Sequence, residues 1–149
     1  MTNVIHNIHA TCVVYQDVGL LICGESGSGK SSLALSLIDK GGYLVSDDRT
    51  DLFEKDGVLY AKAPSLLFDL MEVRHIGLIS GWPVKTQAPI HCIIRLCETE
   101  PNRLPINIKE KLCGYEIMSF TLNKYDFALT SKINTVIQIV KNKLILKSF

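Results

Sequence analysis

The fold is decided by residues 18–40, which read VGLLICGESGSGKSSLALSLIDK from Val18 to Lys40. The apolar run 18–23 predicts a buried strand. Residues 30–40 carry apolar side chains at helical spacing, and Gly41-Gly42 follows as a C-terminal stop. Between the two, residues 24–31 match G-x-x-x-x-G-K-[ST]. A strand, a glycine-rich loop and a helix in this order predict an α/β fold.

The loop at 24–31 predicts a phosphate-binding site. Its glycines let the backbone curl so that N–H groups point inward, and the following helix adds a positive N-terminus. Lys30 can reach the β- and γ-phosphates, and Ser31 can place its hydroxyl on Mg²⁺. We therefore expect a nucleotide and Mg²⁺ as cofactors, with nucleotide contacts from Gly24, Glu25, Ser26, Gly27, Ser28, Gly29, Lys30, Ser31 and Ser32.

Upstream and downstream segments add further predicted elements. Alternation over 8–15 predicts a strand that pairs with 18–23, and Asp56-Gly57 predicts a hairpin turn within 52–61. Pro64 and Ser65 can open a short helix through Met71, and the prolines at 101 and 105 predict an exposed loop. Strands are expected at 43–46, 76–79 and 90–96.

A C-terminal helix is predicted from one apolar face. That face carries Leu129, Ile133, Val136, Ile137, Val140 and Leu144. We interpret the stripe as core packing. The apolar residues of the tail, Leu144, Ile145, Leu146 and Phe149, are expected to cover the core or a neighbouring subunit.

Composition limits the functional classes. With 149 residues, the chain is expected to form one domain over 1–149. The formal net charge of +1 argues against a nucleic-acid or anionic-membrane partner. No apolar run could span a bilayer and residues 1–7 lack signal-peptide features, so we expect a cytoplasmic protein. The cysteines lack CxxC spacing, and His91 with Cys92 and Cys97 reads as part of a buried strand rather than a metal site.

Two adjacent acids follow the strand at 43–46. Asp47 and Asp48 occupy the place where many P-loop enzymes hold a metal-binding carboxylate. Neighbouring side chains on an extended chain point to opposite sides, so one acid can face the metal and the other the attacking group. An Asx-type turn at a strand end is the structural alternative.

At these residues the chain resembles the catalytic domain of the HPr kinase/phosphorylase family. The family's A-D-D-R-V-D reads here as 46–51, SDDRTD, and its L-E-I-R-G-x-G-[IL]-[IL] reads as 71–79, MEVRHIGLI. The family's histidine before the hairpin aligns with His9. With the phosphate loop, four ordered motifs match over residues 9–79.

The resemblance implies a P-loop kinase-like domain with a mixed sheet and flanking helices, related to the phosphoenolpyruvate carboxykinase type. It implies an enzyme that uses ATP to phosphorylate a serine of HPr or a nitrogen-related phosphocarrier, and that removes the phosphate by phosphorolysis, giving pyrophosphate. Pyrophosphate is expected as an alternative donor. By position, the resemblance makes Asp48 the general base and, in the reverse reaction, the acid that returns the proton, while Asp47 supports Asp48 or the metal. It implies that Lys30 stabilises the phosphoryl group and that Ser31 and Glu72 bind Mg²⁺. His9 and Arg74 are expected to surround the site.

The chain also departs from the family pattern. We expect a short form of the family without its N-terminal domain. The family's signature glycine is His75 here, and its C-terminal arginine loop has no clear equivalent near 130–134, where Lys132 is a poor substitute. Docking of the phosphocarrier and the reverse reaction are therefore in question. Family resemblance further implies a homo-oligomer, specifically a hexamer.

Two other functions stay open. A small-metabolite kinase or NTP hydrolase could use the same loop, and Asn123-Lys124-Tyr125-Asp126 fits the guanine-reading pattern N-K-x-D. We interpret that match as coincidental because it lies near the chain's end without the other GTPase motifs. A non-catalytic nucleotide-sensing module is the other alternative, motivated by the missing arginine.

Overall fold

The strand that precedes the phosphate loop lies inside the main sheet of the computed structural model, which describes residues 4–147. Every residue of this strand, β3, is buried. Its two neighbours are the antiparallel strand β2 and the parallel strand β10. The six-stranded sheet runs in the order β11 (Lys109–Leu112), β12 (Tyr115–Asn123), β10 (Cys92–Cys97), β3 (Val18–Cys23), β2 (Ala10–Tyr15) and β4 (Tyr43–Ser46).

Three neighbouring strands of this sheet, β3, β10 and β12, run parallel. Cys97 pairs in register with Asn123, and Arg95 pairs with Cys23. Because the carboxyl ends of parallel strands meet at one sheet edge, the loops that follow these strands gather there. The phosphate loop and the turn after β12 are thus brought to the same edge.

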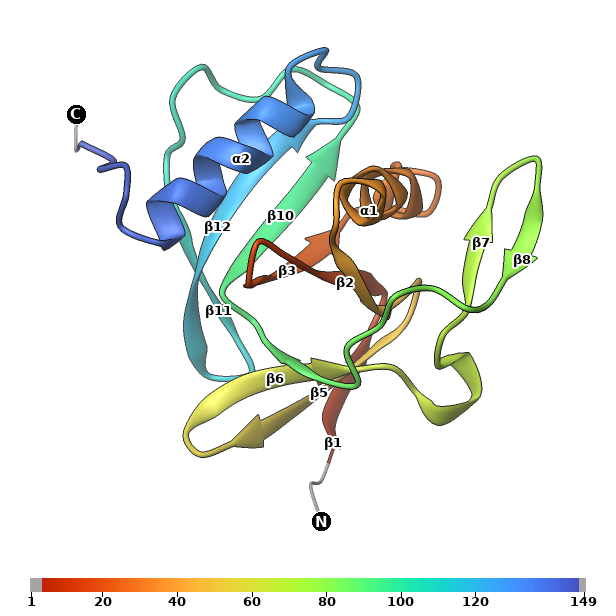
Figure 1. The fold of residues 1–149 in the computed structure, drawn as a ribbon. Coiled ribbons are helices and arrows are strands. Elements are labelled where there is room, and N and C mark those ends of the chain that lie inside the picture. Colours follow the sequence, from red (N-terminus) through yellow and green to blue (C-terminus); the bar gives the residue numbers. More distant parts are fainter. Residues whose placement is uncertain (1–3, 148–149) are drawn as a thin grey trace.

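A second sheet covers one face of the first. It is antiparallel throughout and consists of β1 (Val4–Ile8), β5 (Thr50–Lys55), β6 (Val58–Lys62) and β9 (Ala88–Pro89). Leu21 and Ile93 of the six-stranded sheet are fully buried in one cluster with Leu52 and Leu59 of the second sheet. This cluster therefore lies between the six-stranded sheet and the second sheet, which is the lower one in Figure 1.

Two helices cover the opposite face (Figure 1): α1 (Lys30–Asp39) and α2 (Leu129–Val140). Leu20 and Ile22 of β3 pack here with Leu37 of α1 and Ile133 of α2. Because side chains alternate along a strand, β3 sends Leu20 and Ile22 to the helices and Leu21 to the second sheet. The predicted mixed α/β architecture is confirmed as a layer of helices and two layers of sheet.

A two-stranded hairpin, β7 (Met71–Val73) with β8 (Gly77–Ile79), extends from the body beside α1 (Figure 1). The predicted helix from Pro64 to Met71 is wrong: one 3-10 turn, η1 (Ser65–Leu67), ends well before Met71. Asp69 has a φ of 62°, which breaks any helical path, and Met71 instead pairs with Ile79 and is buried.

Two further boundaries differ from the prediction. Residues 8–15 are not one strand, because β1 ends at Ile8 in one sheet and β2 begins at Ala10 in the other. The C-terminal helix ends at Val140, because Asn142 takes the left-handed φ of 60° that terminates helices, so Leu144 is off its face and half exposed. Of the tail, Ile145 is exposed, and Phe149 lies outside the described residues.

Several predicted elements are confirmed, with small shifts in their bounds. They are the strands at 18–23 and 43–46, the helix after the phosphate loop, the hairpin at Asp56-Gly57 and the loop around Pro101 and Pro105, which contains no helix or strand. The strand expected at 90–96 runs from Cys92 to Cys97, and the one expected at 76–79 begins at Gly77. The hairpin of β11 and β12 was not predicted.

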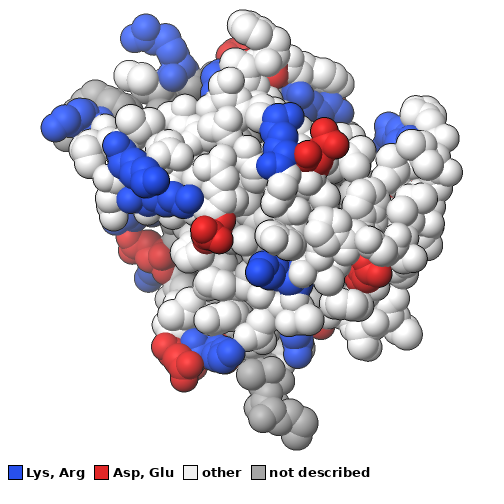
Figure 2. Space-filling model, in the orientation of Figure 1, with Lys and Arg blue, Asp and Glu red and all other residues white. Residues whose placement is uncertain are grey.

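The surface carries charges of both signs. Figure 2 shows Lys and Arg interspersed with Asp and Glu on the visible face, with no continuous basic area there. No helix within residues 4–147 is long and apolar enough to cross a membrane.

Candidate active site

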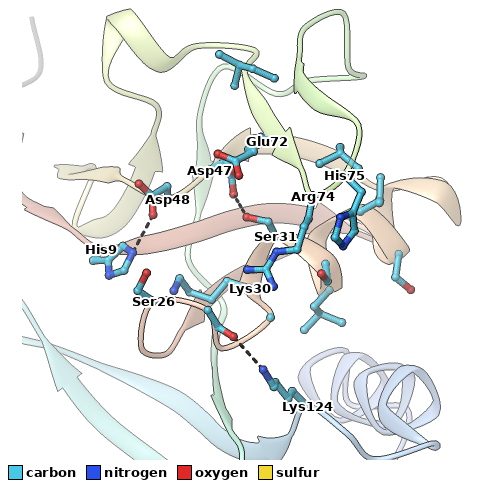
Figure 3. Close-up of a pocket in the computed structure, with 18 of the residues that line it drawn as sticks. His9, Ser26, Lys30, Ser31, Asp47, Asp48, Glu72, Arg74, His75 and Lys124 are labelled. Carbon is cyan, nitrogen blue, oxygen red and sulfur yellow. Dashed lines mark hydrogen bonds and ion pairs between the residues drawn. The ribbon is translucent and has the colours of Figure 1, made fainter.

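A cavity of about 870 Å³ lies at the sheet edge where the phosphate loop, the end of β4, the β7–β8 hairpin and the turn after β12 meet. It collects most of the predicted site residues on one surface (Figure 3). Those that line it are His9, Ser26, Gly27, Gly29, Lys30, Ser31, Ser32, Asp47, Asp48, Glu72 and Arg74.

The phosphate loop has the local geometry that its motif predicts. Gly27 and Gly29 have φ values of 79° and 97°, which a side chain would disfavour, and α1 begins directly after Gly29. The Lys30 ammonium folds across the loop and donates to the carbonyls of Gly24 and Glu25, each at 3.0 Å. A buried cation and a helix N-terminus therefore converge on one concave surface.

Three predicted loop residues do not line this cavity. Gly24 and Glu25 offer their carbonyls to Lys30 and border a second cavity of about 410 Å³ on the other side of the loop. The Ser28 hydroxyl is buried, and among residues 4–147 it has no hydrogen-bond partner.

Asp47 ties the end of β4 to the start of α1. Its Oδ1 accepts hydrogen bonds from Ser31 Oγ at 2.7 Å and from Thr11 Oγ1 at 3.0 Å. Its Oδ2 accepts a longer one from the Glu72 backbone N–H at 3.4 Å. The carboxylate is almost fully buried, so these donors are what compensate its loss of water. Asp47 is thereby joined to the Ser31 side chain and to the backbone of Glu72.

Asp48 points elsewhere because the backbone turns at this residue. Its φ is 69°, in the left-handed region, and its backbone N–H donates to Thr11 Oγ1 at 3.1 Å. The side chain is exposed, and its Oδ1 lies 2.8 Å from His9 Nε2. The two acids thus differ in environment: Asp47 is buried and fully bonded, whereas Asp48 faces the cavity beside a histidine.

Glu72 and Arg74 come from the β7–β8 hairpin. Figure 3 shows the Glu72 side chain next to Asp47, and the Arg74 side chain extending toward the start of α1. The residue that replaces the family's signature glycine, His75, keeps a glycine-like φ of 72° and also lines the cavity. The hairpin therefore adds a carboxylate and a guanidinium to the phosphate loop.

The donor set fits Mg²⁺ bound together with phosphates. Within the described part of the chain, no cluster of three or more His, Cys, Asp or Glu side chains is placed to hold a metal ion alone. Mg²⁺ keeps several waters and takes one or two carboxylates plus substrate phosphates, so it does not need such a cluster. The Ser31 hydroxyl and the Asp47 carboxylate, which are hydrogen-bonded to each other, are two neighbouring oxygen groups that could bind such an ion.

Sequence reasoning missed Thr11 and the role of the turn after β12. Thr11 is fully buried and bonds to both acids, a position that no sequence pattern signals because it depends on the pairing of β2 with β4. Lys124 donates to the carbonyl of Gly27 at 2.9 Å, and Tyr125 lines the cavity. Lys132 instead pairs with Asp126 and is not among the lining residues, so it is not placed as a substitute arginine.

The second cavity has its own charge pair. Arg95 on β10 makes two hydrogen bonds to the Glu110 carboxylate on β11, at 2.9 and 2.6 Å. The bonds from Arg95 hold the pKa of Glu110 below its usual value. Cys23 lies in the same cavity, and burial raises the pKa of its thiol. The Arg95–Glu110 pair links β10 to the edge strand β11 across the intervening β12.

Comparison with known proteins shows the family and the fold of this chain. Residues 3–148 match the family model of the HPr Serine kinase C-terminal domain. The solved structure of the Hpr(Ser) kinase/phosphatase from Coxiella burnetii superposes with a TM-score of 0.80 at 28% sequence identity, covering 93% of this chain and 92% of that one.

Curated relatives match over shorter stretches. The HPr kinase/phosphorylase of Lactobacillus johnsonii is 38% identical over 116 residues, which are 70% of this chain and 36% of the relative. That of Clostridium perfringens is 46% identical over 72 residues, 48% of this chain and 24% of the relative. The matched stretch is thus about a third or less of these relatives' length. The match over nearly every residue and the shared fold show that this chain belongs to the HPr serine kinase C-terminal domain family.

Proposed function

We propose that the chain is a Mg²⁺-dependent kinase that transfers the γ-phosphoryl group of ATP to a serine hydroxyl of HPr or a nitrogen-related phosphocarrier. One observation carries this proposal: an exposed carboxylate, Asp48, bonded to His9, stands in the same cavity as the phosphate loop. A simple phosphate-binding protein has no need of an exposed carboxylate beside its anion, because the two repel each other. A transferase that must take a proton from an alcohol does.

The forward reaction assigns one role to each side chain. The substrate serine Oγ–H gives its proton to the Asp48 carboxylate as the bond from Oγ to the γ-phosphorus forms and the bond to the β-phosphate oxygen breaks, releasing ADP. His9 holds Asp48 Oδ1, so Oδ2 is left for the incoming hydroxyl. Lys30 and Arg74 supply positive charge where negative charge collects on the phosphoryl oxygens.

Asp47, Ser31 and Glu72 would hold the metal ion. A bound Mg²⁺ would supply positive charge and so reduce the charge repulsion that opposes the nucleophile. The buried Asp47 carboxylate is held by Ser31 and Thr11, so its orientation is set before the nucleotide arrives. Such preorganisation avoids a reorganisation cost during the reaction.

The same site can run in reverse with inorganic phosphate. A phosphate oxygen attacks the phosphorus of the phosphoserine, the bond from phosphorus to the serine Oγ breaks, and protonated Asp48 returns its proton to Oγ. The products are serine and pyrophosphate, so by reversibility pyrophosphate can also act as phosphoryl donor. Asp48 is accessible enough to serve in both directions.

The test replaces Asp48 by asparagine. Asparagine also tolerates the left-handed φ of 69°, so the backbone is preserved while the base is removed. We expect phosphorylation of purified HPr, followed by intact-protein mass spectrometry, to fall by about 10²- to 10⁴-fold, the usual contribution of a general base. Nucleotide affinity should survive.

Asp56→Asn is the matched control, because Asp56 also has a positive φ, 53°, but lies in the distant β5–β6 turn. Turnover of the Asp48→Asn variant at the control's rate would contradict the assigned base. Tight nucleotide binding by the wild-type chain with no transfer to any phosphocarrier would instead favour a nucleotide-sensing module.

The family further suggests that the active form is a homo-oligomer, specifically a hexamer, and that the fold is related to the phosphoenolpyruvate carboxykinase type. Analytical ultracentrifugation tests the first point, and a strictly monomeric mass would remove it. Superposition of the sheet and phosphate loop on such an enzyme tests the second.

A further inference from the structure

The turn that follows β12 is attached directly to the phosphate loop. The Lys124 backbone N–H donates to the Cys97 carbonyl at 2.9 Å, which joins the turn to the end of β10. The Lys124 ammonium donates to the Gly27 carbonyl at 2.9 Å, and its stem lies so close to Gly29 that an added Cβ there would be 3.4 Å from Lys124 Cδ. The turn and the loop therefore form one rigid surface.

Lys124 acts in this surface as a connector rather than as a phosphate ligand. Its ammonium is also 3.0 Å from the Glu98 carboxylate, so its charge is already paired. The hydrogen bond to Glu98 raises the pKa of Lys124, which keeps the connector charged. The neighbouring residue, Tyr125, lines the cavity beside Lys124.

Tyr125 is an exposed aromatic ring held in place by its backbone. The ring is 69% exposed, and it lines the active-site cavity. Its backbone N–H donates to Asn123 Oδ1 at 2.8 Å, and the Lys124 ammonium lies 4.9 Å from the ring centroid. An exposed aromatic ring on a fixed turn is a surface on which a planar group can stack with little loss of conformational freedom.

Asp126, the residue that would read guanine in an N-K-x-D segment, is not available to a ligand. Its Oδ1 accepts from the Ala128 N–H at 2.8 Å, its Oδ2 pairs with Lys132, and it is not among the residues that line the cavity. The donors on the Watson–Crick edge of guanine therefore find no open carboxylate here. The turn has a stacking surface and no base-reading acceptor.

We propose that this turn is the base subsite of the nucleotide donor, with the base stacked on Tyr125 beside Leu129 and Thr130, and with adenine and guanine accepted alike. Figure 3 shows Lys124 on the opposite side of the phosphate loop from Asp47 and Glu72. A nucleotide with its γ-phosphate at the acids would thus extend its nucleoside toward the turn. This inference rests on the proposed nucleotide-dependent function.

The test compares ligands with and without a base. Isothermal titration calorimetry measures the affinities of ATP, GTP and inorganic tripolyphosphate, each with Mg²⁺, for wild-type protein, Tyr125→Ala, Tyr125→Phe and Phe127→Ala. Phe127 is the matched control, because it is fully exposed on the same turn but does not line the cavity.

We expect Tyr125→Ala to weaken ATP and GTP by about 5- to 150-fold, the loss that corresponds to one stacked base. Tripolyphosphate affinity should stay unchanged, which also shows that the variant is folded. Tyr125→Phe and Phe127→Ala should bind all three ligands like the wild type, and ATP and GTP should differ by less than about fivefold, because no acceptor reads the base.

Wild-type ATP affinity in Tyr125→Ala, or an equal loss of tripolyphosphate, would overturn the subsite. A preference for either ATP or GTP of more than about fivefold would overturn the lack of base reading. Because the readout is binding, it is separate from transfer: a Tyr125-dependent affinity in a protein that phosphorylates no carrier would support the subsite while the proposed kinase fails. Phosphorylation of HPr from pyrophosphate by a protein that binds no nucleoside would support transfer to HPr and overturn the base subsite.

Discussion

Gly19, in the strand that leads into the phosphate loop, is packed against backbone. A Cβ built on Gly19 would lie 1.8 Å from the carbonyl oxygen of Pro89, whereas real contacts of this kind stay above 3.0 Å. Gly19 N–H also donates to His91 Nδ1 at 2.8 Å, and its carbonyl accepts from His91 N–H at 2.9 Å. We expect Gly19→Ala to separate β3 from the segment around Pro89 and to destabilise the fold.

The size of the effect follows from these contacts. Pro89 O is backbone and cannot rotate away, so the two segments must move apart by more than about 1 Å, an overpacking that typically costs 1–3 kcal/mol. Stretching the two bonds to His91 adds about 1 kcal/mol, since a net hydrogen bond is worth about that much. A total of about 3 kcal/mol would lower the Tm by about 6–12 °C in a chain of this size.

The assay is thermal unfolding followed by circular dichroism, with Gly57→Ala as control. Gly57 has a φ of 76° and nothing within 4 Å of an added Cβ, so its substitution adds backbone strain of about 1 kcal/mol without a clash. A Tm for Gly19→Ala equal to or above that of Gly57→Ala would refute the argument. A loss of phosphate-loop ligand affinity at low temperature would show that the shift of β3 reaches the loop.

Three further changes are expected. Burial lowers the pKa of His91 below its usual 6.5. The free energy of unfolding should therefore fall as the pH drops below 6.5 toward that lowered pKa. In urea unfolding, His91→Gln should reduce this change in the free energy of unfolding between pH 7 and pH 5. Arg95 lowers the pKa of Glu110 below 4.5, so the stability from this pair is present above pH 4.5 and is lost as the pH falls through the lowered pKa. In the same assay, Glu110→Gln should lose up to about 1 kcal/mol of unfolding free energy at pH 7. The variant should not show the further loss of stability that the wild type shows below pH 4.5. Burial raises the pKa of Cys12 to about 12, so iodoacetamide followed by peptide mass spectrometry should find Cys113 modified well before Cys12.

Local patterns were enough to predict the central unit of the fold. The strand, loop and helix at 18–40 were confirmed, because an apolar run, a glycine-rich motif and a glycine stop each act within a few residues. Prediction was wrong where pairing between strands decides the structure. Met71 was assigned to a helix, yet its pairing with Ile79 makes it a strand residue, and β12 was missed because its position beside β10 depends on residues more than 20 positions away.

The sequence by itself determined which chemical groups are present and in what order: a phosphate loop, two adjacent acids and a Glu-Val-Arg segment. Tertiary structure decided how they divide their tasks. The left-handed turn at Asp48 separates two neighbouring acids, so that Asp47 is buried on Ser31 and Asp48 reaches His9 across the sheet. The parallel pairing of β10 and β12 carries Lys124 to the phosphate loop. Both outcomes come from contacts between residues far apart in the chain, which local patterns do not encode.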